Sequence, residues 1–127
     1  MLDPNLYIAF TNEIGRGVFT KEIILKDTVI EVAPVIVMSG SEREYLDETL
    51  LHDYIFEWGE KKEQCCVALG YISMYNHSNE SNSEYFMNFD DDTIFIKTVR
   101  KINKGEEITI NYNGTWNNAA KLWFDAK

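Results

Sequence analysis

The segment Tyr75-Asn76-His77-Ser78 gathers amide, imidazole and hydroxyl groups directly after an apolar stretch, and Asn79-Glu80-Ser81-Asn82 extends it. Side chains of these types can hold a polar ligand through hydrogen bonds. The alternative is a plain surface loop of Asx-turns, which the same residues favour. The pattern therefore indicates either a binding loop or an ordinary turn.

A second candidate segment is Gly15-Arg16-Gly17, which precedes an apolar pair, Val18-Phe19. Closely spaced glycines let the backbone approach a ligand and expose its amides and carbonyls. Most such pairs are simply turns. The third glycine and the helix of a dinucleotide-binding fingerprint are missing, so that class of site is excluded.

Two tyrosines stand where strands are expected. Tyr112 lies near the end of the segment 105–114 and precedes an Asn-Gly turn, which would place its phenol at a strand end. Tyr54 opens the apolar run Tyr54-Ile55-Phe56. Each is equally consistent with an ordinary aromatic residue of a β-strand.

The positions of the histidines and cysteines do not favour a metal site or a covalent catalytic site. His52 is the only histidine besides His77, and neither has an acidic partner at ligand spacing. The two cysteines, Cys65 and Cys66, are adjacent, which suits two reduced, buried thiols better than a CxxC pair. No metal is expected.

Composition narrows the class of protein. The chain has 127 residues, 45% of them hydrophobic, which suits one globular domain spanning 1–127. A net charge of −9 argues against direct binding of nucleic acid and favours basic partners. No apolar run approaches the roughly 20 residues of a membrane span. No leader is seen, so cytoplasmic location is the default expectation.

The pattern predicts a mainly β protein of many short strands with one or two short helices. A capping-box signal, Ser41 with Glu44, predicts a helix over 42–52. Pro34 should split the β-branched run 28–38 into two strands joined at a kink. A short helix carrying Trp123 is expected over 117–124. The other expected strands are 6–10, 18–20, 54–58, 66–69, 85–89, 93–99 and 107–111, with 85–89 and 93–99 forming a hairpin.

A weak internal repeat relates 18–32 to 96–110 at a constant offset. Ile24 corresponds to Ile102 and Lys26 to Lys104, and each copy runs from a strand through a turn into another apolar strand. Either chance or two related β-ribbons could produce this match.

Taken in order, three segments resemble the SET domain of protein-lysine methyltransferases over almost the whole chain. They are the Gly15-Arg16-Gly17 segment, Asn76-His77-Ser78 with Asn82, and Gly105-Glu106-Glu107-Ile108-Thr109-Ile110-Asn111-Tyr112. The resemblance is greatest to the minimal viral and bacterial SET proteins, which lack a pre-SET module and a zinc-binding post-SET module. It implies a β-clip fold with a C-terminal pseudoknot that brings Asn76 and His77 beside Tyr112.

Three positions depart from the family pattern. Ser81 replaces the usual proline, which should leave the loop less rigid; Ser73 stands where many members carry arginine or histidine; and Asn111 replaces an aspartate. These departures leave open an alternative in which the domain has lost catalysis and serves as an interaction module. A less favoured alternative is an unrelated small β protein.

The resemblance implies S-adenosylmethionine as methyl donor and a lysine of a basic, histone-like or ribosomal protein as acceptor. Tyr112 would orient the reacting groups, Tyr54 would line the lysine channel, and the Tyr85 hydroxyl would limit the number of methyl groups. A homodimer is left open. The implied cofactor-binding residues are Gly15, Arg16, Gly17, Ser73, Asn76, His77 and Tyr112, with Trp123-Phe124 stacking on the adenine.

Overall fold

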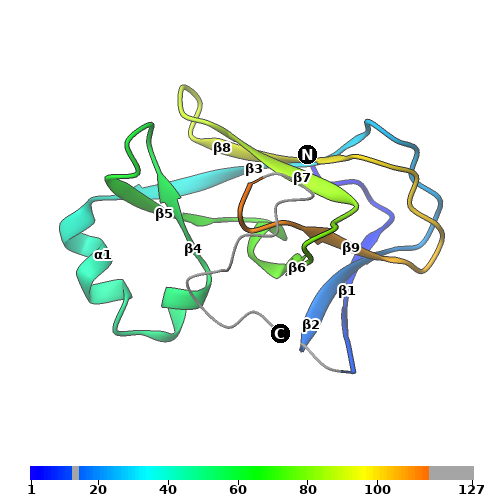
Figure 1. Ribbon diagram of the computed structural model, residues 1–127, viewed down its shortest axis with the longest axis horizontal. Helices are drawn as coiled ribbons and strands as arrows, with labels where there is room; N and C mark the ends of the chain where they lie inside the picture. The colour runs from blue at the N-terminus through cyan, green and yellow to red at the C-terminus, as the bar shows by residue number, and fades with distance from the viewer. Residues whose placement is uncertain (13–14, 115–127) are drawn as a thin grey trace.

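The computed structural model describes residues 1–12 and 15–114. In this part of the chain the strands form two sheets, one ordered β1-β2-β9-β6 and the other β4-β5-β3-β8-β7 (Figure 1). The expectation of a mainly β protein with short strands in small sheets is confirmed. The strands are β1 Leu6–Phe10, β2 Arg16–Thr20, β3 Val29–Met38, β4 Ile55–Trp58, β5 Gln64–Ala68, β6 Asn76–His77, β7 Ser83–Asn88, β8 Thr93–Thr98 and β9 Glu107–Ile110.

The run around Pro34 is one ten-residue strand, β3, so the expectation of two strands joined at a kink is wrong. What changes along β3 is its partner: Val29–Pro34 pair with β8, and Val35–Met38 pair with β5 on the opposite edge. Proline has no N–H to donate, and Pro34 stands where one ladder ends and the other begins. A partner switch therefore accommodates it without breaking the strand.

The expected helix over 42–52 is two elements: α1 (Gly40–Leu46) and a 3₁₀ turn, η1 (Leu50–Asp53). The capping box also lies two residues earlier than expected. The Ser39 hydroxyl accepts from the amide of Glu42 at 3.2 Å, and the Glu42 carboxylate accepts from the amide of Ser39 at 2.8 Å. The second element starts separately because the Thr49 side chain caps it.

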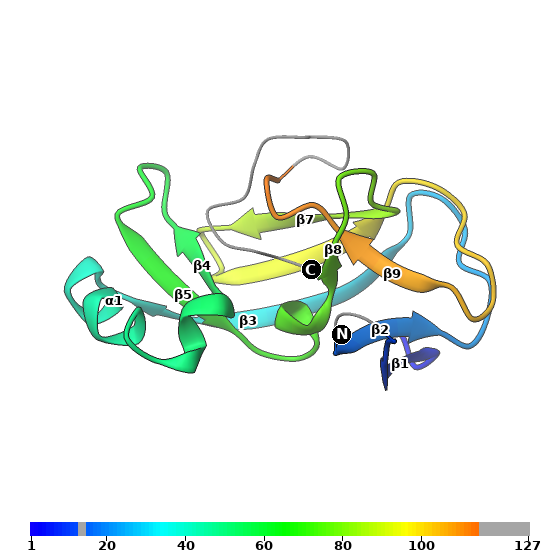
Figure 2. The same ribbon diagram turned by 60° about the horizontal axis from the view of Figure 1, so that its bottom comes forward.

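One hydrophobic core draws residues from both sheets, and it is rich in isoleucine. Figure 2 shows α1 at one end of the molecule and the β1–β2 pair at the other. The expected hairpin is β7–β8, with Tyr85 opposite Ile96. Tyr85 and Met87 pack on the core side, while Phe86 is exposed and stacks on Phe95.

The internal repeat is confirmed by reciprocal hydrogen bonds. Ile24 and Ile102, which correspond in the repeat, exchange backbone bonds of 2.9 and 2.8 Å. The Asp27 amide donates to Thr98, and the corresponding Gly105 amide donates to Thr20, at 3.0 and 2.8 Å. Both turn residues are left-handed, with φ of 61° and 80°. The two β-ribbons therefore pair with each other through equivalent positions.

Candidate active site

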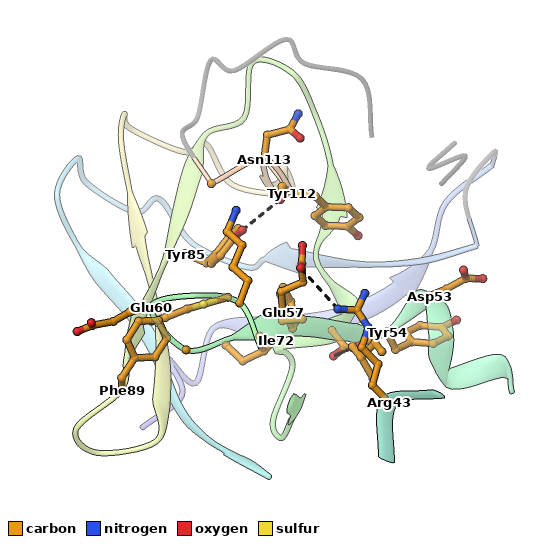
Figure 3. Close-up of a pocket in the computed structure, with 17 residues that line it drawn as sticks. Arg43, Asp53, Tyr54, Glu57, Glu60, Ile72, Tyr85, Phe89, Tyr112 and Asn113 are labelled. Atoms are coloured by element: carbon orange, nitrogen blue, oxygen red, sulfur yellow. Dashed lines mark hydrogen bonds and ion pairs between the residues drawn. The ribbon is translucent and has the colours of Figure 1, made fainter. Parts of the chain in front are cut away.

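A cavity of about 460 Å³ opens where η1, β4 and β7 approach the segment after β9. The three tyrosines singled out from the sequence, Tyr54, Tyr85 and Tyr112, all line it (Figure 3). They come from different elements, so only the folded chain gathers them. An aromatic cavity of this kind suits an apolar chain that ends in a polar group.

Tyr112 lies two residues beyond the end of β9, slightly later than expected. Its hydroxyl donates to the backbone carbonyl of Tyr75 at 2.7 Å. Burial raises the pKa of Tyr112 to about 12, and the neighbouring Tyr54 and Glu107 add to the shift. The phenol is therefore neutral near pH 7 and acts as a hydrogen-bond donor.

Tyr85, on β7, points its hydroxyl at the segment after β9 and donates to the backbone carbonyl of Tyr112 at 3.1 Å (Figure 3). Burial raises the pKa of Tyr85, and the carboxylate of Glu57 adds to the shift. Its ring also packs 5.6 Å from that of Phe56 on β4. Tyr85 thus links β7 to the backbone that carries Tyr112.

Tyr54 caps the end of η1 and precedes β4, so its assignment to a strand is wrong by one residue. Its backbone carbonyl accepts from the hydroxyl of Ser73 at 3.1 Å. Ser73 lies on the 3₁₀ turn η2 (Ile72–Met74) and lines the tyrosine cavity. The small side chain at this position therefore ties η2 to Tyr54.

The rim of the cavity carries charges of both signs. Asp53, Glu57 and Glu60 supply carboxylates, and Arg43 and Lys62 supply cations. Arg43 and Glu57 form an ion pair at 3.5 Å, which partly neutralises one side. The lining is net negative and suits a cationic ligand.

The glycine segment and the Asn-His segment meet at a second place. The side-chain amide of Asn76 donates to the Arg16 carbonyl at 3.1 Å and to the Glu107 carboxylate at 2.7 Å. A Cβ at Gly17 would overlap that carboxylate and lie 2.9 Å from the Asn76 nitrogen. Gly17 lies in strand β2, and Gly15 before it is left-handed with φ of 88°. Glycine is thus required at Gly17 for close approach, whereas at Gly15 it is favoured by the positive φ.

His77 joins this second cluster to the cavity. Asn76 and His77 form strand β6, which pairs in parallel with β9, so they are not part of a loop. The expectation that this pair lies beside Tyr112 is confirmed, because Nδ1 of His77 accepts from the Tyr112 amide at 3.1 Å. The threading of a pseudoknot by the C-terminal segment stays a prediction.

Side-chain bonds accompany two departures from the family pattern. The Ser81 hydroxyl is buried and donates to the Ser83 carbonyl at 2.7 Å, so a hydrogen bond anchors the loop where proline was expected. The Asn111 amide donates to the Asn79 carbonyl at 3.4 Å, and its oxygen accepts from the Asn113 amide at 2.9 Å. An ionised aspartate could not make the first of these bonds.

Asn82 has a structural role. It is buried, its amide donates to the Glu107 carbonyl at 2.8 Å, and its oxygen accepts from the Thr109 amide at 2.9 Å. These bonds fasten the end of the Asn-His segment to β9. The geometry thus places Asn82 as a brace for β9.

Some expectations concern other parts of the chain. Trp123, Phe124 and the helix over 117–124 lie outside the described residues. Within residues 1–12 and 15–114, no group of three or more His, Cys, Asp or Glu could hold a metal ion. Cys65 and Cys66 are buried free thiols, and burial raises the pKa of Cys66 to about 12.

Sequence reasoning missed the buried carboxylate of Glu31, and it named Tyr75 only as the first residue of the Asn-His segment. Glu31 is a buried carboxylate in β3, and it accepts from the Tyr75 hydroxyl at 2.7 Å. The available signal was a lone acidic residue within the apolar run 29–38. Charged residues are almost never fully buried unless they are paired.

Comparisons with known proteins agree with this geometry. A sequence profile of the SET domain matches residues 15–113. A Schizosaccharomyces pombe protein named histone-lysine N-methyltransferase, H3 lysine-37 specific, is 35% identical over 121 residues, covering 94% of this chain and 77% of that protein. The crystal structure of a candidate histone methyltransferase from Plasmodium falciparum superposes with a TM-score of 0.68 at 28% identity, covering 91% of this chain and 98% of that one.

Proposed function

The chain belongs to the SET-domain family and is a protein-lysine methyltransferase, and on that premise we propose that it transfers methyl groups from S-adenosylmethionine to a lysine of a basic, histone-like protein. The observation that carries the proposal is the meeting of Tyr54, Tyr85 and Tyr112 around one cavity. The Asn-His segment adjoins this cavity through the bond between His77 and Tyr112.

The residues around Gly17 fit the methyl donor. The missing Cβ lets the backbone of β2 lie against the side chains of Asn76 and Glu107. We expect the main-chain groups of the Gly15-Arg16-Gly17 segment to contact the donor beside this cluster. When bound, S-adenosylmethionine supplies an electrophilic methyl group on a sulfonium. We assign Gly15, Arg16, Gly17, Asn76 and His77 to holding it.

The tyrosine cavity fits the acceptor. A lysine amine has a pKa of about 10.4 and must be neutral to attack a methyl group, which costs roughly 4 to 5 kcal/mol at pH 7. An aromatic, water-poor cavity lowers that cost because it disfavours the ammonium form. Tyr112 is too weak an acid to serve as a phenolate base, so its role is to orient the amine.

Charge supports a basic substrate. The whole chain carries a net charge of −9, and Asp53, Glu57 and Glu60 stand on the cavity lining. Such a surface attracts lysine-rich segments and repels nucleic acid. The S. pombe relative is named for histone H3, which is a basic protein of this kind. Within the described residues, no helix has the length and apolar character needed to cross a bilayer.

The proposal is tested by methyl transfer from labelled S-adenosylmethionine to core histones and ribosomal proteins. Tyr112→Phe should lose most of the transfer and keep its cofactor affinity in calorimetry. The matched control is Tyr45→Phe, because Tyr45 lies on α1 and is 76% exposed. Labelled lysine with the wild type and Tyr45→Phe, but not with Tyr112→Phe, would support the proposal. A wild type that neither binds S-adenosylmethionine nor transfers the label would refute it.

A further inference from the structure

Glu31 is the most unusual charged residue of the core. It is only 1% exposed and is the third residue of β3. Its carboxylate accepts from the Tyr71 amide at 2.8 Å and from the Tyr75 hydroxyl at 2.7 Å. A Cβ at Gly70 would overlap one of the carboxylate oxygens, and Gly70 is left-handed with φ of 66°. The backbone before Tyr71 is therefore shaped around this carboxylate.

The two donors to Glu31 flank the turn η2. Tyr71 precedes η2 and Tyr75 follows it, so the carboxylate grips the turn at both ends. The turn η2 and the residue after it also contact two tyrosines of the cavity. The Ser73 hydroxyl donates to the Tyr54 carbonyl at 3.1 Å, and the Tyr75 carbonyl accepts from the Tyr112 hydroxyl at 2.7 Å.

We propose that Glu31 is a positioning residue for methyl transfer: by gripping both ends of η2, it fixes the carbonyl that orients the Tyr112 hydroxyl. This inference rests on the proposed function. Glu31 does not line the cavity; it acts through Tyr75, whose side chain is fully buried. A shift of the Tyr75 carbonyl would turn the Tyr112 hydroxyl away from the amine, and small displacements of this kind cost rate steeply.

A role in stability alone does not account for Glu31. Among the described residues it forms no ion pair, and burying a carboxylate without a cation is unfavourable. Burial raises the pKa of Glu31, although the bonds from Tyr71 and Tyr75 and the charged amino terminus lower it in part. The folded state thus disfavours the ionised form, so the free energy of unfolding falls as the pH rises through the raised pKa. A glutamine at this position should fold at least as well at neutral pH.

The first test is Glu31→Gln in the full chain, with Glu44→Gln on the exposed face of α1 as the matched control. The glutamine oxygen can accept from the Tyr71 amide, but its NH2 group can only donate to the Tyr75 hydroxyl, so the charge-assisted bond from Tyr75 is replaced by a weaker, reversed one. We expect kcat to fall about ten- to a hundredfold. Tm, the KM for the histone substrate and the affinity for S-adenosylmethionine should stay close to the wild-type values.

Tyr75→Phe and the Tyr112→Phe background provide the second test. Tyr75→Phe keeps Glu31 and deletes the bond altogether, so it should lower kcat at least as much as Glu31→Gln, and combining the two substitutions should add little. In the Tyr112→Phe background, Glu31→Gln should change the residual single-turnover rate less than about twofold, since residues that act through one contact are not additive.

The outcomes separate this inference from the proposed function. If the wild type methylates histones and Glu31→Gln does so at an unchanged kcat, the positioning role is wrong and the proposed function stands. Full additivity of Glu31→Gln with Tyr112→Phe would also overturn it. A wild type without transfer would reject the proposed function itself, whatever the behaviour of the variants.

Discussion

The backbone amide of Tyr112 donates a hydrogen bond of 3.1 Å to Nδ1 of His77, from a residue 35 positions further along the chain. Since Nδ1 accepts, the proton of the neutral ring resides on Nε2, which lies 2.9 Å from the side-chain oxygen of Asn79. The imidazole and phenol rings also pack with centroids 5.1 Å apart. His77 therefore serves to hold the backbone of Tyr112.

This bond predicts how substitutions at His77 behave. His77→Leu removes the acceptor and should lower kcat about tenfold or more, while the free energy of unfolding falls by about 1–3 kcal/mol because the Tyr112 amide loses its partner. His77→Asn can present a side-chain oxygen near the position of Nδ1, so it should recover part of the rate. Steady-state kinetics and urea unfolding check both variants. Equal losses of kcat in the two variants would show that the hydrogen-bond acceptor at position 77 does not determine the rate.

Gly17→Ala should weaken binding of the methyl donor. The added methyl group meets Asn76 and Glu107, so one of these side chains must move. We expect the Kd for S-adenosylmethionine to rise about tenfold and the free energy of unfolding to fall by about 1–3 kcal/mol, as overpacked sites do. Calorimetry and thermal melting measure the two effects.

Gly15→Asn tests the effect of the positive φ in this segment separately from the effect of steric overlap. A Cβ at Gly15 meets nothing within 4 Å, and asparagine tolerates positive φ better than most residues. This variant should therefore lose less than about 1 kcal/mol of stability. If Gly15→Asn were as damaging as Gly17→Ala, the close approach at Gly17 would not be the cause.

Tyr85→Phe should change the number of methyl groups added. It removes the hydroxyl that donates to the Tyr112 carbonyl and leaves extra space in the cavity beside the amine. Intact-mass analysis of the methylated substrate should show more di- and trimethyl-lysine than the wild type produces. Tyr7→Phe on β1, where the ring stacks on Phe19, is a control outside the cavity. An unchanged product distribution would show that the Tyr85 hydroxyl does not limit the number of methyl groups added.

The pH dependence of transfer should follow the substrate amine. Burial raises the pKa of Tyr112 to about 12, so its hydroxyl stays protonated over the range in which a lysine with a pKa of about 10.4 titrates. The single-turnover rate should rise with pH up to about 10 without a step from Tyr112. The residual rate of Tyr112→Phe should rise with the same slope. A slope that disappears in this variant would mean that Tyr112 acts as the base.

The raised pKa of Tyr112 also makes the free energy of unfolding fall at alkaline pH. The fold favours the neutral phenol, so this contribution is fully present below pH 10.0 and is lost as the pH rises toward about 12. Urea unfolding at increasing alkaline pH should show a steeper loss of stability for the wild type than for Tyr112→Phe. Similar slopes would indicate that other tyrosines dominate the alkaline transition.

The strands were largely predictable because their signal is local. Two β-prone runs on either side of the turn Asp90-Asp91-Asp92 predicted the β7–β8 hairpin, in which Ile94 and Ile96 face the core. The helix start was not predictable in the same way. Ser39 and Ser41 are each followed by a glutamate three residues later, so the sequence offers two capping boxes. Only the end of β3 at Met38 selects Ser39.

The sequence by itself determined which chemical groups this protein has for its reaction. Gly17, Asn76, His77 and Tyr112 were recognisable from their types and order, because a short motif is a local pattern. The tertiary structure alone decided how these groups are held, through the parallel pairing of β6 with β9 and the bonds of Glu31 to a turn 40 and 44 positions away. Such partners are chosen by burial and hydrogen-bond satisfaction across the whole fold. Local sequence periodicity therefore does not predict these partners.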